Sequence, residues 1–123
     1  MEQYDLGFIY ALLGETVSKI LLYINRFNDS YATEIADHFS MNQQTIQYNV
    51  EKLESAGILI SQPVGRTRLY RVNPRYVLRH ELTKLLEKAL RYLPDEIATS
   101  YYMKRSRPRT KGKILRKYQG NQE

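Results

Sequence analysis

The chain contains no cysteine, and this absence removes several classes of site at once. Without a thiol there is no disulfide, no thiolate metal site and no cysteine nucleophile. Apolar runs are also short, far below the roughly 20 residues that a membrane-spanning helix needs. No basic segment followed by a long apolar run stands near the N-terminus, so we expect no signal peptide. These absences favour a soluble, cytoplasmic protein with no membrane partner.

Recognisable catalytic machinery is missing as well. The sequence shows no paired nucleophile and base, no glycine-rich loop to cradle a phosphate, and no cluster of metal ligands. His38 has no thiol beside it, and His80 has Glu87 seven residues later but no second histidine at ligand spacing. We therefore expect a protein that is not an enzyme and that has no cofactor and no metal site.

Positive charge is unevenly distributed along the 123 residues. The formal net charge is +6, yet residues 101–123 alone carry +7 and the first 100 residues −1. Within those 100, residues 43–79 carry +4 and residues 1–42 carry −4. One basic middle segment and one basic tail are typical of a protein that presents a positive face to a polyanion.

Apolar spacing predicts helices over residues 5–13, 15–26, 33–39 and 42–56. Asn42 is a good N-cap for the fourth helix, and Gly57 suits the position after its end. Residues 58–62 and 67–72 then alternate as the two strands of a hairpin, with a turn near Gly65. The longest helix is expected over residues 77–93, after Pro74. This order predicts a mainly α fold: a winged helix-turn-helix with a two-stranded β-hairpin wing and a long C-terminal dimerisation helix.

The fourth helix has two different faces. Ile46, Val50 and Leu53 share one of them and are expected in the core. The opposite face and first turn offer amides and a hydroxyl that could read base edges in the major groove of double-stranded DNA. The candidate base-contacting residues are Gln43, Gln44, Gln47 and Tyr48. The alternative is that these polar residues only face solvent. The hairpin that follows in the sequence favours DNA binding over this alternative.

The hairpin places two arginines near its tip, within reach of a phosphate or a minor groove. The candidate backbone and wing contacts are Asn42, Thr45, Lys52, Arg66, Thr67 and Arg68. A solvated wing without a ligand is the alternative interpretation.

Four segments carry a resemblance to a known family: residues 14–24, 34–46, 50–59 and 65–74. The ending Leu53…Ala56-Gly57 and the wing Gly65-Arg66…Tyr70…Asn73-Pro74 are its most specific parts. Together, residues 14–74 resemble the winged helix-turn-helix of ArsR-type transcriptional regulators. The resemblance implies a homodimer that is paired through its first and last helices and reads successive major grooves. Ser40 departs from it, because that turn position is usually Gly, and the metal-sensing residues are absent.

The last helix follows a complete winged core, so part of its apolar stripe would stay exposed in a monomer. We expect that stripe to pack against the same stripe of a second copy of the chain. The candidate dimer-interface residues are Leu6, Ile9, Leu13, Leu78, Leu82, Leu85, Leu86, Ala89 and Leu93. A stripe buried in the chain's own core is the simpler alternative.

Residues 1–93 are expected to form the DNA-binding and dimerisation domain, and residues 94–123 a basic, flexible tail. The tail resembles an AT-hook weakly, with Ser106 in place of the usual Gly, and a phosphate clamp suits it better. Its candidate contacts are Lys104, Arg105, Arg107, Arg109, Lys111 and Lys113.

The leading hypothesis is a DNA-binding regulator, dimeric, nucleoid-associated and repressing by occlusion, with any small-molecule effector unknown. A winged-helix adaptor for other proteins and an RNA-binding protein acting through the tail are the alternatives.

Overall fold

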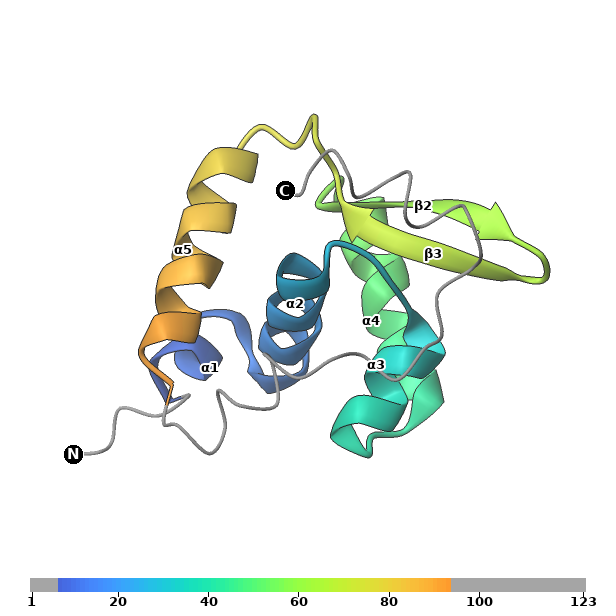
Figure 1. Cartoon of the computed structure of the whole chain (residues 1–123), viewed down its shortest axis with the longest axis horizontal. Coiled ribbons are helices and arrows are strands. Elements are labelled where there is room, and N and C mark those ends of the chain that lie inside the picture. The colour runs from blue at the N-terminus through green and yellow to red at the C-terminus, as the bar shows by residue number, and fades with distance from the viewer. Residues whose placement is uncertain (1–6, 94–123) are drawn as a thin grey trace.

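The computed structural model describes residues 7–93, and they form a mainly helical fold with a small three-stranded antiparallel sheet (Figure 1). This architecture is compatible with a winged helix. In chain order the elements are α1 (Gly7–Leu13), α2 (Glu15–Phe27), β1 (Ser30–Tyr31), α3 (Ala32–Phe39), α4 (Gln43–Ser55), β2 (Leu59–Val64), β3 (Thr67–Val72) and α5 (Arg79–Arg91).

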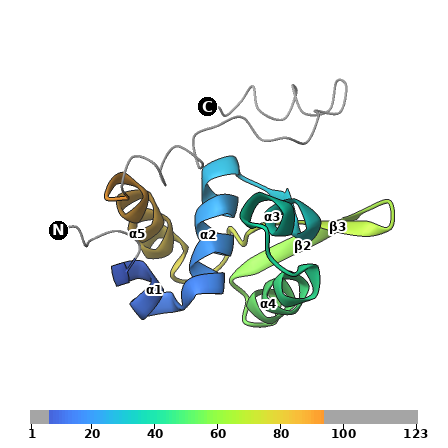
Figure 2. The same cartoon turned by 90° about the horizontal axis from the view of Figure 1, so that it is seen from below.

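Helix α2 lies at the centre of the fold. Five consecutive side chains, from Ile20 to Ile24, are buried, so this helix is covered on all sides rather than along one stripe. Figure 2 shows why: α1 and α5 cover one side of α2, while α3, α4 and the sheet lie on the other. The core is therefore one continuous cluster around α2.

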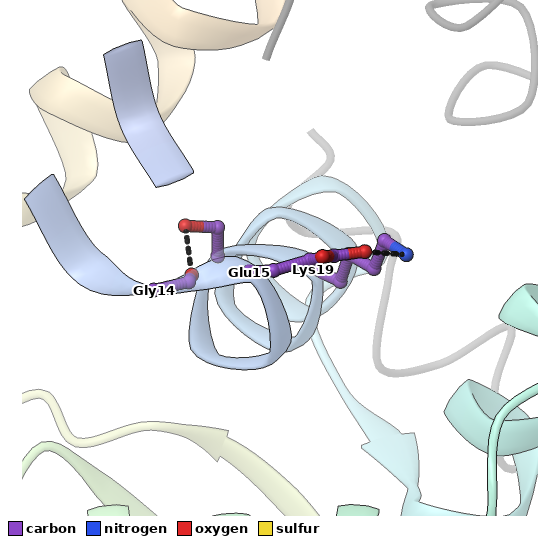
Figure 3. Close-up of polar contacts among 4 residues, drawn as sticks. Gly14, Glu15 and Lys19 are labelled. Atoms are coloured by element: carbon purple, nitrogen blue, oxygen red, sulfur yellow. Dashed lines mark hydrogen bonds and ion pairs between the residues drawn. The ribbon is translucent and has the colours of Figure 1, made fainter. Parts of the chain in front are cut away.

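The junction between α1 and α2 depends on Gly14, whose backbone dihedrals are φ 90° and ψ 150°. Only glycine adopts this conformation without large strain. The buried Ser18 hydroxyl lies 2.6 Å from the Gly14 carbonyl oxygen and 3.1 Å from that of Ile9, so it satisfies backbone groups at the bend (Figure 3). On the solvent side Lys19 Nζ lies 2.9 Å from Glu15 Oε2, an exposed pair of small energetic value.

The predicted hairpin is present, and β1 adds a third strand that sequence analysis missed. The strand order is β1-β3-β2, with Ser30 opposite Tyr70 and Leu59 opposite Val72. The turn is also shorter than expected, because Pro63 still pairs with Arg68 in the edge strand β2. Only Gly65 and Arg66 connect the strands, and a φ of 63° at Gly65 suits a type II′ turn.

Helix α5 is shorter than the predicted helix over residues 77–93. Its 13 residues equal the lengths of α2 and α4, so it is not the longest helix. It packs on α2, with Leu86, Ala89 and Leu90 buried. Val77 and Leu78 precede it as exposed side chains. Among the helices of residues 7–93, none combines the length and apolarity that crossing a membrane requires.

Candidate nucleic-acid interface

Helices α3 and α4 form a helix-turn-helix with a connection of three residues, 40–42. Ser40 adopts a left-handed conformation, with φ 55° and ψ 46°. The amide of Met41 donates to the Ala36 carbonyl at 2.9 Å and that of Ser40 to Asp37 at 3.3 Å, the Schellman pattern. The tight turn expected from the sequence is thus made with a residue that carries the strain glycine would avoid.

The N-terminus of α4 is held by the predicted N-cap. The Asn42 side-chain oxygen accepts from the backbone amides of Gln44 at 2.8 Å and Thr45 at 3.2 Å. Two of the amides that a helix start leaves unpaired are thereby satisfied. The cap fixes the first turn of α4, the turn that carries the glutamines.

The two faces of α4 are arranged as the spacing predicts. Ile46, Val50 and Leu53 are buried, which confirms the predicted core face. On the other side the exposed residues are Gln43, Gln44, Thr45, Tyr48, Glu51, Lys52 and Ser55. Tyr48 is 65% exposed, and its ring lies 6.0 Å from Lys52 Nζ. The first turn also lines a shallow hollow of about 490 Å³, with Asn42, Gln43, Gln44 and Gln47 around it.

Gln47 differs from its neighbours because its amide group is engaged inside the protein. Its Nε2 donates to Glu51 Oε2 at 2.7 Å and to the Tyr70 hydroxyl at 3.3 Å. Tyr70 lies on β3 and is buried, and burial raises the pKa of its phenol above the ordinary 10.0. Gln47 therefore connects α4 to the hairpin, and its amide nitrogen is already used.

A second polar bridge connects α4 to the hairpin. The Ser61 hydroxyl donates to Glu54 Oε2 at 2.8 Å and accepts from Arg68 Nε at 2.8 Å. Arg68 thus lies on the side of the hairpin that faces α4 and is itself exposed, as are Arg66 and Thr67 at the tip. Sequence analysis missed Ser61, Glu54 and Glu51, because only the strand register reveals that they meet these partners.

The surface formed by α4 and the hairpin carries little net charge. Residues 43–68 hold three cationic side chains, Lys52, Arg66 and Arg68, and two carboxylates on α4, Glu51 and Glu54, so they sum to only +1. Both carboxylates accept hydrogen bonds from the bridges just described. The larger positive charge, +7, belongs to residues 101–123, and the six candidate tail residues between 104 and 113 fall outside the described residues.

Four predicted dimer residues lie inside the chain's own core, and the structure corrects their assignment. Ile9, Leu86, Ala89 and Leu93 are at most 6% exposed, because α1 and α5 both pack against α2. Leu13, Leu82 and Leu85 are half-buried and Leu78 is 50% exposed, while Leu6 falls outside the described residues. Among residues 7–93, the large apolar side chains that remain exposed are Phe8, Leu12, Val77, Leu78 and Tyr92, besides Tyr48 on α4.

The two histidines lie far apart in the sequence and on different helices. His38 stands beside Tyr23, with ring centroids 4.9 Å apart. Partial burial there lowers the pKa of His38 from its ordinary 6.5, and the Glu34 carboxylate opposes this in part. His80 is exposed on α5. Residues 7–93 contain no group of three or more histidine, aspartate or glutamate side chains placed to hold a metal ion.

No protein-family model matches the chain. A search of known proteins finds similarity to an uncharacterized HTH-type transcriptional regulator of Methanocaldococcus jannaschii. The two are 31% identical over 81 residues, or 66% of this chain. The chain spans only about a fifth of that protein's length, since the match covers 20% of it.

Proposed function

We propose that this chain is a sequence-specific, double-stranded DNA-binding transcriptional regulator of the ArsR-like type that acts without enzymatic chemistry. The observation that carries the proposal is the start of α4. There Asn42 caps a helix whose first turn exposes Gln43 and Gln44 beside a hairpin with Arg66 at its tip. An exposed helix start can enter a major groove, and glutamine amides pair with adenine edges.

The proposed DNA contacts are assigned by which hydrogen-bonding groups each side chain still has free. Gln43, Gln44 and Tyr48 would reach base edges, because their side chains are exposed. Backbone phosphates would be met by Asn42, Thr45, Lys52, Arg66 and Thr67. Gln47, whose amide nitrogen already donates to Glu51 and Tyr70, and Arg68, whose Nε donates to Ser61, would mainly hold the angle between α4 and the hairpin.

Similarity to a protein described as an HTH-type transcriptional regulator supports this proposal. The match reaches 66% of the chain, so it must include much of the region that contains α3, α4 and the hairpin. Repression by occlusion, cytoplasmic location and nucleoid association belong to the same proposal. So does a basic tail at residues 94–123 that adds salt-dependent affinity for phosphates of any sequence.

We further propose a homodimer, so that two copies of α4 read half-sites about one helical turn apart. Since four of the predicted dimer residues are core residues, the interface would use the exposed apolar side chains. Phe8 and Leu12 are four residues apart and so share one face of α1. Figures 1 and 2 both show the end of α5, near Tyr92, beside that helix.

The test is selection of bound sequences from a random double-stranded DNA pool with the full chain, followed by affinity measurement on the selected site. Replacing Gln44 with Ala should weaken the selected site by about 1–3 kcal/mol and relax the preference at one base pair. Affinity for unrelated DNA should hardly change, because phosphate contacts stay. The control is Ser55→Ala, at the exposed C-terminal end of α4.

Three outcomes would contradict parts of the proposal. Enrichment of no sequence would remove sequence-specific binding. A preference for RNA over DNA of equal length and salt would assign the chain to a different class of partner. An unchanged base preference in Gln44→Ala would remove the base-reading role of this residue while leaving DNA binding intact.

A further inference from the structure

A second hollow, of about 710 Å³, lies on the side of the sheet that faces away from α4. It is surrounded by the end of α2, by the strands β2 and β3, and by the first turns of α5. Figure 1 shows the end of α2, the end of β3 and the start of α5 on the same side of the fold. Strand alternation explains the sheet's contribution. Because Tyr70 and Ser61 face α4, their neighbours Arg71 and Gln62 face the hollow.

Two arginines from different elements line this hollow. Arg71 comes from β3, and Arg79 is the first residue of α5. Within residues 7–93, neither guanidinium group has a hydrogen bond or ion pair to another residue. Two carboxylates, those of Asp29 and Glu87, line the same hollow, but within residues 7–93 neither is paired with Arg71 or Arg79, so both guanidinium groups keep their donors for an anion. Guanidinium groups also match the planar geometry of carboxylate and phosphate groups.

The remaining lining is polar and can accept as well as donate. Asn25, Asn28 and Gln62 supply amides, which do both. The Thr83 hydroxyl donates to the Arg79 carbonyl at 2.7 Å, so toward the hollow it can only accept. The Glu87 carboxylate lies one further turn along the same face of α5. This lining suits a ligand that carries both an anionic group and its own N–H or O–H donors.

The floor of the hollow reaches the core. Ile24 and Asp29 at this floor are buried, whereas Arg71, Arg79 and Glu87 are exposed, so the hollow is open to solvent. The volume falls within the range of small-molecule sites. The hollow lies between two elements that pack on different neighbours. Helix α5 packs chiefly on α2, whereas β3 belongs to the hairpin.

We propose that the hollow between α2, β3 and α5 is a binding site for a small organic anion, with its carboxylate or phosphate group held by Arg71 and Arg79. The N–H or O–H donors of the ligand would meet Thr83 and Glu87. A ligand in this place would join α5 to the strand that carries the wing. The proposal does not depend on DNA binding.

The experiment measures binding of inorganic phosphate, citrate and glutamate to the full chain by titration calorimetry at matched ionic strength. At least one of them should bind saturably at millimolar concentration. The double variant Arg71→Gln, Arg79→Gln should weaken that binding by about tenfold or more, since two charge-assisted contacts are lost. The matched control Arg75→Gln, Lys88→Gln removes the same charge from exposed residues outside the hollow and should bind as the wild type does.

The three probes separate the sources of the anion. Binding of phosphate alone would indicate a phosphorylated ligand, and binding of citrate would indicate a carboxylate ligand. Tighter binding of glutamate than of citrate would indicate a ligand with an ammonium group that contacts Glu87. Absence of saturable binding by all three would overturn the proposal, and so would equal weakening in the control. If the arginine variant weakened DNA binding while no small anion bound, the site would belong to the DNA backbone and the proposal would be wrong.

Discussion

At the residue scale, Ser40 shows how a helix-turn-helix is closed without glycine. Two helices end in the same hydrogen-bond pattern, α3 at Ser40 and α4 at Gly57, whose φ is 83°. Both positions require a left-handed backbone conformation, and only glycine adopts that conformation without steric cost. Asn28, which ends α2, also has a positive φ of 77°, but its ψ of −35° lies outside the left-handed helical conformation that Ser40 adopts.

Replacing Ser40 with Gly should therefore stabilise the fold by about 0.5–1 kcal/mol. The relieved left-handed strain exceeds the extra entropy that glycine gives the unfolded chain. Urea denaturation measures the change, and Ser55→Gly, the same substitution at an exposed helical position of α4, is the control and should lose stability. A loss of stability in Ser40→Gly, or an equal gain in both variants, would contradict this interpretation of the turn.

His38 makes the stability of the fold dependent on pH. Burial beside Tyr23 lowers its pKa, so between the lowered value and 6.5 the unfolded chain binds more protons than the folded one. The contribution of His38 is complete above pH 6.5 and is lost as the pH falls through that window. Urea denaturation of wild type and His38→Gln from pH 7 to about pH 5 should show a smaller decrease in the variant. A folded-state pKa above 6.5, measured by NMR titration, would reverse the sign and contradict the prediction.

At the element scale, the hairpin and α4 are joined by polar bridges as well as by the core. Gln47 reaches Tyr70, and the Ser61 hydroxyl stands between Glu54 and Arg68. A hairpin attached only at its base could move relative to α4, so these bridges set the angle between the hairpin and α4. In the proposed complex, that angle decides whether α4 and the tip of the hairpin can contact the same DNA duplex.

Replacing Ser61 with Ala should lower the free energy of unfolding by about 1 kcal/mol, because Glu54 and Arg68 each lose a partner. Hydrogen exchange of the β2 and β3 amides should become faster in the same variant. The control is Thr67→Val, which removes an exposed hydroxyl from the same hairpin with little change in shape. Equal effects in the two variants would show that the bridge does not hold the hairpin.

At the scale of the whole molecule, the proposed homodimer requires an exposed apolar surface. The exposed side chains of α1 are the strongest candidates, because Phe8 is 44% and Leu12 62% exposed on one helix face. Burying that face against a second copy would remove the cost of its exposure to water.

The double variant Phe8→Ser, Leu12→Ser should therefore shift the chain from dimer to monomer in sedimentation equilibrium. Removing four large side chains across a twofold interface would weaken association by several kcal/mol, since each buried large side chain contributes about 1.5–3 kcal/mol. Val77→Ser is the control, because Val77 is 86% exposed and stands before α5. A wild-type chain that stays monomeric at high concentration would remove the dimer from the proposal.

Local sequence determined much of this fold. Apolar periodicity placed α2 and α4, Asn42 marked the start of α4 and Gly57 its end, and alternation with Gly65 indicated the hairpin. These features succeed because helix caps, helix faces and tight turns depend on residues within a few positions of one another. The buried face of α4, with Ile46, Val50 and Leu53, followed from spacing alone.

The tertiary structure decided what those local patterns leave open. It added β1 to the sheet through the pairing of Ser30 with Tyr70, and it sorted the leucines of α5 into core and surface. It also turned Gln47 and Arg68 toward partners within the protein, one of them 23 positions away. Such outcomes depend on contacts between distant parts of the chain, and no local pattern in the sequence encodes which distant group a polar side chain will meet. Cysteine was absent from the start, so this fold is held by packing around α2 and by hydrogen bonds rather than by cross-links.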